Sequence, residues 1–127
     1  LWIYDNTSWN FMPLTLILQP DHDSPVMTEE VFWPVLPIIV YDTIDQVIAY
    51  ANDTIYWLGA YVRWQDKWTI DKVCSQLKTG NISVNNTTYL IPQVPFGWYK
   101  PASGNFREHG MLGLRNYTEI KVVSMPL

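Results

Sequence analysis

Residues 35–85, VLPIIVYDTIDQVIAYANDTIYWLGAYVRWQDKWTIDKVCSQLKTGNISVN, decide the fold, because strand-like and helix-like patterns alternate along them. Apolar and β-branched residues fill 35–41 and 58–63, and 81–85 alternates between polar and apolar positions. Such short runs bounded by turn-forming residues are typical of strands. Pro37 inside the first run indicates a bulge or an edge strand.

Two amphipathic helices are predicted between these strands. In each, apolar residues recur at helical spacing: Ile44, Val47, Ile48 and Ala51 in the first, and Ile70, Val73, Cys74 and Leu77 in the second. Thr43 with Gln46 forms a capping-box pattern before the first helix, and Asp66 can cap the second. Gly80 is expected to end the second helix in the left-handed conformation.

The order strand, helix, strand, helix, strand implies two crossover units. Such units join parallel strands through right-handed connections, so the fold class is α/β. Residues 1–27 form a poorly defined N-terminal segment with a short buried strand at 14–18, and 28–115 form the main domain. A long loop is expected over 86–104 and a short helix over 106–115. The closing segment, 116–127, is expected to hold a strand.

The composition excludes several classes of protein. The 127 residues are 48% hydrophobic and 16% charged, with a net charge of −4 and no basic stripe, so nucleic-acid binding is not predicted. We recognise no signal peptide and no apolar run approaching the roughly 20 residues that a membrane span needs. Cys74, the single cysteine, excludes an internal disulfide and fits a reducing compartment. A cytoplasmic location is therefore expected.

Five ordered motifs over about 100 residues resemble the C-terminal region of the aldehyde dehydrogenase superfamily, that is, the end of its catalytic domain and its oligomerisation strand. The first is EEVFWPV at 29–35, which resembles the family's Glu-Glu-[Ile/Val]-Phe-Gly-Pro-Val. The others are TGNISVN at 79–85, PFGWYK at 95–100, REHG at 107–110 and YTEIK at 117–121.

The resemblance implies NAD(P)-dependent oxidation of an aldehyde to a carboxylic acid. In that chemistry a cysteine thiolate attacks the carbonyl and a glutamate activates the deacylating water. In the family both residues lie upstream of the motif at 29–35. We therefore expect this chain to carry part of a catalytic domain, to hold no catalytic residue, and to be inactive alone.

The resemblance also implies the site residues. Glu30 matches a glutamate that binds the nicotinamide ribose of NAD or NADP, and Phe32 matches an aromatic beside the nicotinamide. Phe96 and Leu90 match the wall of the substrate tunnel. Residues 117–125 match a strand that joins the sheet of a partner subunit, which implies a homo-oligomer. No metal site is predicted, because His22 and His109 have no partner at ligand spacing.

Aromatic residues stand at four positions where the family usually has glycine: Trp33, Trp57, Trp98 and Phe106. A bulky residue costs about 1–2 kcal/mol at a left-handed position and overpacking costs about 1–3 kcal/mol more. The alternative is therefore a non-catalytic binding or structural module derived from the same fold.

Two other features have competing interpretations. Cys74 lies on the apolar stripe of its helix, which favours packing over reactivity. Six of the eight asparagines begin an Asn-x-Ser/Thr triplet, where chance would give about one. The triplets leave a secreted glycoprotein as a minor alternative, although Asn81 and Asn85 lie in or beside a predicted strand, where a glycan fits poorly.

Overall fold

The structure is a computed structural model, and it describes residues 12–32, 34–56, 58–87, 90–97, 99 and 106–126. The chain forms two compact units, Leu1–Asp42 and Thr43–Leu127. Both contain parallel strand pairs with intervening helices, so the predicted α/β class is confirmed.

The first unit pairs two short strands around a single helical turn. Strand β1 (Thr15–Leu18) runs parallel to β2 (Val35–Ile38), and α1 (Pro25–Thr28) lies between them in the sequence. Gln19 secures the end of the pair, since its backbone N–H donates to the Ile38 oxygen at 2.8 Å and its Oε1 accepts from the Val40 N–H at 2.7 Å.

Two expectations for this unit need correction. The strand predicted over 35–41 ends at Ile38. Of the two readings of Pro37, the edge strand fits, because Pro37 pairs with Ile17 in unbroken register within a sheet of two strands. Neither strand is fully buried, because alternate side chains point to opposite faces and one face of each is open. Leu16 is 67% exposed and Leu36 is 58% exposed. Helix α1 was not predicted, because four residues are too few to show a helical period.

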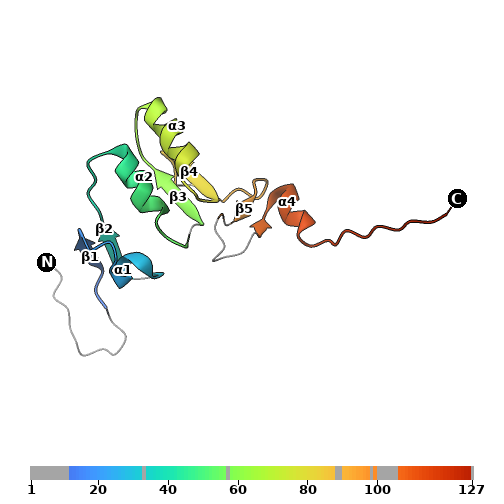
Figure 1. Cartoon of the computed structure of the whole chain (residues 1–127), viewed down its shortest axis with the longest axis horizontal. Helices are drawn as coiled ribbons and strands as arrows, with labels where there is room; N and C mark the ends of the chain where they lie inside the picture. Colours follow the sequence, from blue (N-terminus) through green and yellow to red (C-terminus); the bar gives the residue numbers. More distant parts are fainter. Residues whose placement is uncertain are drawn as a thin grey trace. The chain divides into compact units, whose positions relative to one another are not determined.

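The second unit is built on a strand-helix-strand crossover (Figure 1). Strand β3 (Gly59–Val62) pairs in parallel with β4 (Asn81–Val84), and α3 (Lys67–Gln76) connects them. Helix α2 (Ile44–Asn52) precedes the crossover and packs on α3. The Lys72 ammonium lies 2.5 Å from the Asp45 carboxylate and ties the two helices together.

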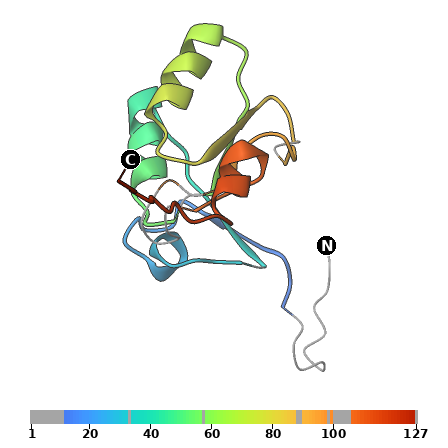
Figure 2. The same cartoon turned by 90° about the vertical axis from the view of Figure 1, so that its right-hand side faces the viewer.

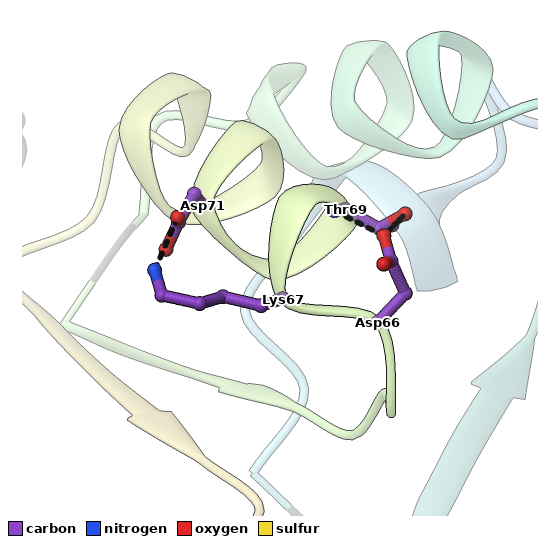
Figure 3. A network of polar contacts seen from close by, with 4 residues as sticks. All are labelled: Asp66, Lys67, Thr69 and Asp71. Carbon is purple, nitrogen blue, oxygen red and sulfur yellow. Dashed lines mark hydrogen bonds and ion pairs between the residues drawn. The ribbon is translucent and has the colours of Figure 1, made fainter.

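Helices α2 and α3 begin at the caps that the sequence predicts. The Thr43 hydroxyl accepts from the Gln46 N–H at 3.1 Å. Asp66 accepts from the Thr69 N–H at 2.7 Å and from the Thr69 hydroxyl at 2.8 Å, and Lys67 pairs with Asp71 one turn later (Figure 3). Each cap satisfies backbone donors that the first helical turn leaves free.

Gly80 does not cap α3 as expected. The helix ends at Gln76, and Leu77 at its C-cap has an extended backbone. Gly80 is absent from the described glycines with positive φ, which are Gly97 and Gly110. A side chain at Gly80 would instead collide with another stretch of backbone, so the glycine is required by packing.

The region predicted as a long loop contributes one strand to a small antiparallel ribbon. Strand β5 (Phe96–Gly97) pairs with β6 (Arg107–Glu108), and α4 (Gly110–Arg115) follows. The helix predicted over 106–115 therefore starts four residues late, because 107 and 108 are taken by β6. His109 stands between the two elements with φ 60° and ψ 166°.

The expected C-terminal strand has no partner strand among the described residues of this chain. Residues 118–126 leave α4 as an extended segment (Figures 1 and 2). Its apolar side chains are open, with Ile120 95% and Val122 87% exposed. In the part of the chain that the structure describes, no helix is both long and apolar enough to cross a membrane.

Candidate functional site

Phe96, the predicted tunnel aromatic, lies in β5 and is half-buried. Its backbone is in register with Glu108 of β6. On its side-chain face, the ring of His109 lies 6.2 Å away between centroids and is tilted by 34°. Phe96 therefore occupies a defined position, set by contacts from a second strand and from the residue that precedes α4.

The carboxamide of Asn81 holds the backbone on both sides of Phe96. Its Nδ2 donates to the Pro95 oxygen at 3.2 Å, and its Oδ1 accepts from the Gly97 N–H at 3.1 Å. Asn81 begins β4, so these bonds connect the parallel strand pair to the ribbon that carries Phe96.

Two glycines allow β5 to lie this close to its neighbours. A Cβ added to Gly80 would lie 1.6 Å from the Gly97 oxygen, and one added to Gly97 would lie 2.4 Å from the Phe106 oxygen. Both distances are far shorter than real carbon contacts. The backbone at Gly97 is therefore enclosed on two sides, and only glycine fits at either position.

His109 combines a strained backbone with an unsatisfied ring nitrogen. Its φ and ψ fall in a region that is otherwise almost restricted to glycine. Its Nδ1 is buried and has no hydrogen-bond partner among the described residues. The side chain borders a cavity of about 510 Å³, whose lining comprises Pro92, Glu108, His109, Gly110, Gly113, Leu114 and Tyr117.

A larger cavity of about 800 Å³ lies at the carboxyl ends of β3 and β4. It is lined by Arg63, Trp64, Gln65, Asp66 and Asn85. Asn85 closes one wall, because its amide bonds both the N–H of Trp64, at 3.1 Å, and the oxygen of Trp64, at 2.8 Å. Ligands of open parallel sheets commonly bind beyond this edge.

The remaining predicted site residues are accessible. Glu30 and Phe32 belong to the first unit, between α1 and β2, and Phe32 is 87% exposed. Leu90 belongs to the second unit and is 54% exposed. The exposed carboxylate of Glu30 is suited to accept a hydrogen bond from a ribose hydroxyl. The exposed ring of Phe32 is suited to pack on a nicotinamide face. Within the described ranges, no cluster of three His, Cys, Asp or Glu residues could bind a metal ion.

Only one of the four aromatics at family glycine positions can be placed. The side chain of Phe106 is 43% exposed, so the ring turns partly outward and is not forced into the packed space around Gly97. Trp33, Trp57 and Trp98 lie outside the described residues.

Cys74 does not have the environment of a nucleophile. It is half-buried on α3, and burial raises the pKa of its thiol, with a further contribution from the Asp71 carboxylate. Reactive cysteines need the opposite, an electropositive site that lowers the pKa. The result agrees with the packing role that its position on the apolar stripe indicates.

Several asparagines of the Asn-x-Ser/Thr triplets use the nitrogen that a glycan would modify. In four of them Nδ2 donates to a backbone oxygen: Asn52 to Gln76, Asn81 to Pro95, Asn85 to Trp64 and Asn116 to Arg107. These four amides therefore join backbone segments, a structural role that does not require glycosylation.

Sequence reasoning did not identify Asn81 and His109 as neighbours of Phe96. Asn81 belonged to the TGNISVN motif and to an Asn-x-Ser triplet, and neither indicated a contact with residues 95–97. His109 belonged to the REHG motif and was considered only as a metal ligand. Their proximity to Phe96 depends on the pairing of β5 with β6, and the sequence gives no periodic signal for strands of two residues.

Comparison with known proteins identifies relatives along nearly the whole chain. The aldehyde dehydrogenase family profile matches residues 4–123. A curated protein of Staphylococcus haemolyticus, whose name places it among the aldehyde dehydrogenases, is 38% identical over 119 residues. That match covers 94% of this chain but only 24% of the relative.

Solved structures give the same result. The aldehyde dehydrogenase AldC of Pseudomonas syringae, a mutant in complex with NAD+ and octanal, superposes with a TM-score of 0.75 and 42% identity, over 82% of this chain and 21% of AldC. Lactaldehyde dehydrogenase from Escherichia coli superposes with a TM-score of 0.81 and 31% identity, over 89% of this chain and 24% of that enzyme. The chain thus spans about a quarter of its relatives' length, and it belongs to the aldehyde dehydrogenase family.

Proposed function

We propose that this chain is the C-terminal portion of an NAD(P)-dependent aldehyde dehydrogenase that oxidises an aldehyde to a carboxylic acid. The observation that carries the proposal is the family match over residues 4–123, combined with coverage of only 24% of a full-length relative. A segment of this extent supplies walls and contacts to an active site. The segment alone does not oxidise aldehydes.

The contribution to cofactor binding is assigned to Glu30 and Phe32. The Glu30 carboxylate accepts hydrogen bonds from the nicotinamide ribose, and the exposed ring of Phe32 packs beside the nicotinamide. When bound, NAD(P) accepts the hydride released in aldehyde oxidation. Both side chains are open in the first unit, which supports this role.

The contribution to substrate binding is assigned to Phe96 and Leu90, which form part of the tunnel wall. Phe96 is held on several sides, as an aromatic that shapes a binding surface should be. The catalytic thiolate and the general base are supplied by other parts of the enzyme. The raised pKa of Cys74 supports its exclusion from the nucleophile role.

Residues 117–125 are assigned to subunit pairing. Their extended backbone and open apolar side chains suit a strand that is added to the sheet of a second subunit. We also place the enzyme in the cytoplasm, since the single cysteine of this segment, Cys74, fits a reducing compartment.

A chimera tests the catalytic assignment. The part of Pseudomonas syringae AldC that precedes the matched region is joined to this chain, and NAD+ reduction is followed with octanal. We expect turnover by the chimera and none by the 127-residue chain alone. Glu30→Ala in the chimera should raise the KM for NAD+, because a ribose contact is lost.

Intact AldC and the chimera are first compared by thermal unfolding. A chimera that unfolds cooperatively but neither binds NAD+ nor oxidises octanal would favour the alternative, a non-catalytic module derived from this fold. That alternative rests on the aromatics at four family glycine positions.

A further inference from the structure

We infer that Asn81 is a positioning residue that fixes Phe96 and thereby determines how large an aldehyde the tunnel accepts. The inference rests on the proposed function, since it concerns the tunnel wall of that enzyme. Asn81 itself need not touch the substrate. It acts through the two backbone hydrogen bonds that enclose Phe96.

Asn81 is itself firmly placed. It begins β4 in register with Gly59, and its backbone N–H donates to the Leu58 oxygen at 3.2 Å. Its side chain is half-buried. The parallel strand pair therefore provides a fixed base for the carboxamide.

The carboxamide takes the place of a neighbouring strand along one edge of β5. Backbone groups of residues i and i+2 point to the same edge of a strand, and those of residue i+1 point to the other. Asn81 bonds the Pro95 oxygen and the Gly97 N–H, while Phe96 pairs toward Glu108 of β6. Both edges of this two-residue strand are thus occupied.

The contact needs an amide. A carboxamide presents one acceptor and a donor group in a single plane, whereas a carboxylate presents acceptors only and an alkyl side chain presents neither. Asn81→Asp therefore keeps an acceptor for the Gly97 N–H but loses the bond to the Pro95 oxygen. Asn81→Leu, of similar shape, loses both.

Loss of both bonds should affect large substrates selectively. The backbone at residues 95–97 would be held by β6 alone, and the Phe96 ring would be free to shift relative to His109. A long aldehyde that packs along the tunnel depends on that ring, whereas a short one does not reach far along the wall.

Enzyme kinetics separate this role from simple destabilisation. In the AldC chimera, Asn81→Leu should raise the KM for octanal by roughly tenfold, because the displaced Phe96 ring no longer packs along the bound alkyl chain. The kcat with propanal should stay within about twofold of the unsubstituted chimera. Asn81→Asp should give an intermediate KM for octanal.

Asn52→Leu is the matched control. Its amide also joins two backbone groups, the Gln76 oxygen at 2.9 Å and the Lys78 N–H at 2.8 Å, but at the ends of α2 and α3. It should lower thermal stability without changing the octanal-to-propanal ratio of kcat/KM.

Hydrogen exchange on the 127-residue chain gives a readout that does not depend on activity. The Gly97 amide should exchange roughly tenfold faster in Asn81→Leu than in the unsubstituted chain, and its protection should survive in Asn81→Asp.

The two proposals fail in different ways. A folded wild-type chimera that oxidises neither aldehyde would refute the proposed function. An active chimera in which Asn81→Leu leaves the octanal-to-propanal ratio unchanged would overturn only the positioning role. Unchanged Gly97 exchange in that variant would do the same.

Discussion

Gly80 lies where the start of β4 meets the backbone of β5, and a methyl group there would lie 1.6 Å from the Gly97 oxygen. The atoms nearest to this methyl group all belong to the backbone, so the clash is relieved only if the backbone moves. We expect Gly80→Ala to lower the free energy of unfolding by about 1–3 kcal/mol, the usual cost of overpacking. Denaturant unfolding checks this, with Ser75→Ala on the exposed side of α3 as control. Equal stability of the two variants would contradict the packing role.

Cys74 makes a second prediction at this scale. Burial and, to a lesser extent, the Asp71 carboxylate raise the pKa of its thiol, so the thiolate fraction at pH 8 is smaller than for a free cysteine. A thiol reagent should therefore modify the folded chain more slowly than the chain in denaturant. Asp71→Asn should accelerate the reaction of the folded chain, because one cause of the raised pKa is removed. Faster modification of the folded than of the unfolded chain would refute the packing assignment.

At the scale of elements, capping explains why the helix starts could be predicted. Thr43 and Asp66 each bond a residue three positions ahead, so the signal lies within four residues of sequence. The end of α3 could not be read in the same way. Gly80 resembles a helix-ending glycine locally, but its requirement arises from contact with residue 97, which is distant in the sequence.

The N-cap of α3, Asp66, should stabilise the helix to a degree that depends on pH. The hydrogen bond from the Thr69 N–H, followed by that from its hydroxyl, lowers the pKa of the Asp66 carboxyl below its usual value of 3.8. A carboxyl with a lowered pKa contributes stability above that usual value and loses it as the pH falls through the folded-state value. Asp66→Asn keeps an N-cap oxygen but has no charge.

The advantage of the unsubstituted chain over Asp66→Asn in melting temperature should therefore be constant near neutral pH and shrink as the pH drops below 3.8. Melting curves followed by circular dichroism measure this difference. A difference that grows toward acid pH would mean that the cap does not favour the ionised carboxyl.

Across the whole molecule, elements whose pattern lies within neighbouring residues could be predicted from the sequence. Elements that depend on contacts between distant residues could not. The crossover of β3, α3 and β4 followed from apolar spacing over residues 58–85. The surroundings of Phe96 did not, because β5 and β6 are two residues each and pair across a gap of about ten residues. The motif resemblance predicts Phe96 as a wall residue, and the tertiary structure adds that Asn81 and His109 contact its surroundings.

The C-terminal segment supplies the last prediction. Residues 118–126 are extended and expose Ile120 and Val122, so the proposed homo-oligomer should form by pairing this segment with a second subunit's sheet. A strand added at the margin of a sheet bonds through one of its two edges, and neighbouring residues direct their N–H groups to opposite edges. Proline removes the N–H and is tolerated only on the free edge.

Of Val122→Pro and Val123→Pro, one should therefore convert the chain to a monomer in sedimentation velocity, and the other should leave the oligomer intact. Val122→Thr and Val123→Thr keep the backbone donors and should both remain oligomeric. Loss of the oligomer in all four variants would point to side-chain packing in place of strand pairing. If the unsubstituted chain is itself a monomer, residues 117–125 do not pair subunits in this chain.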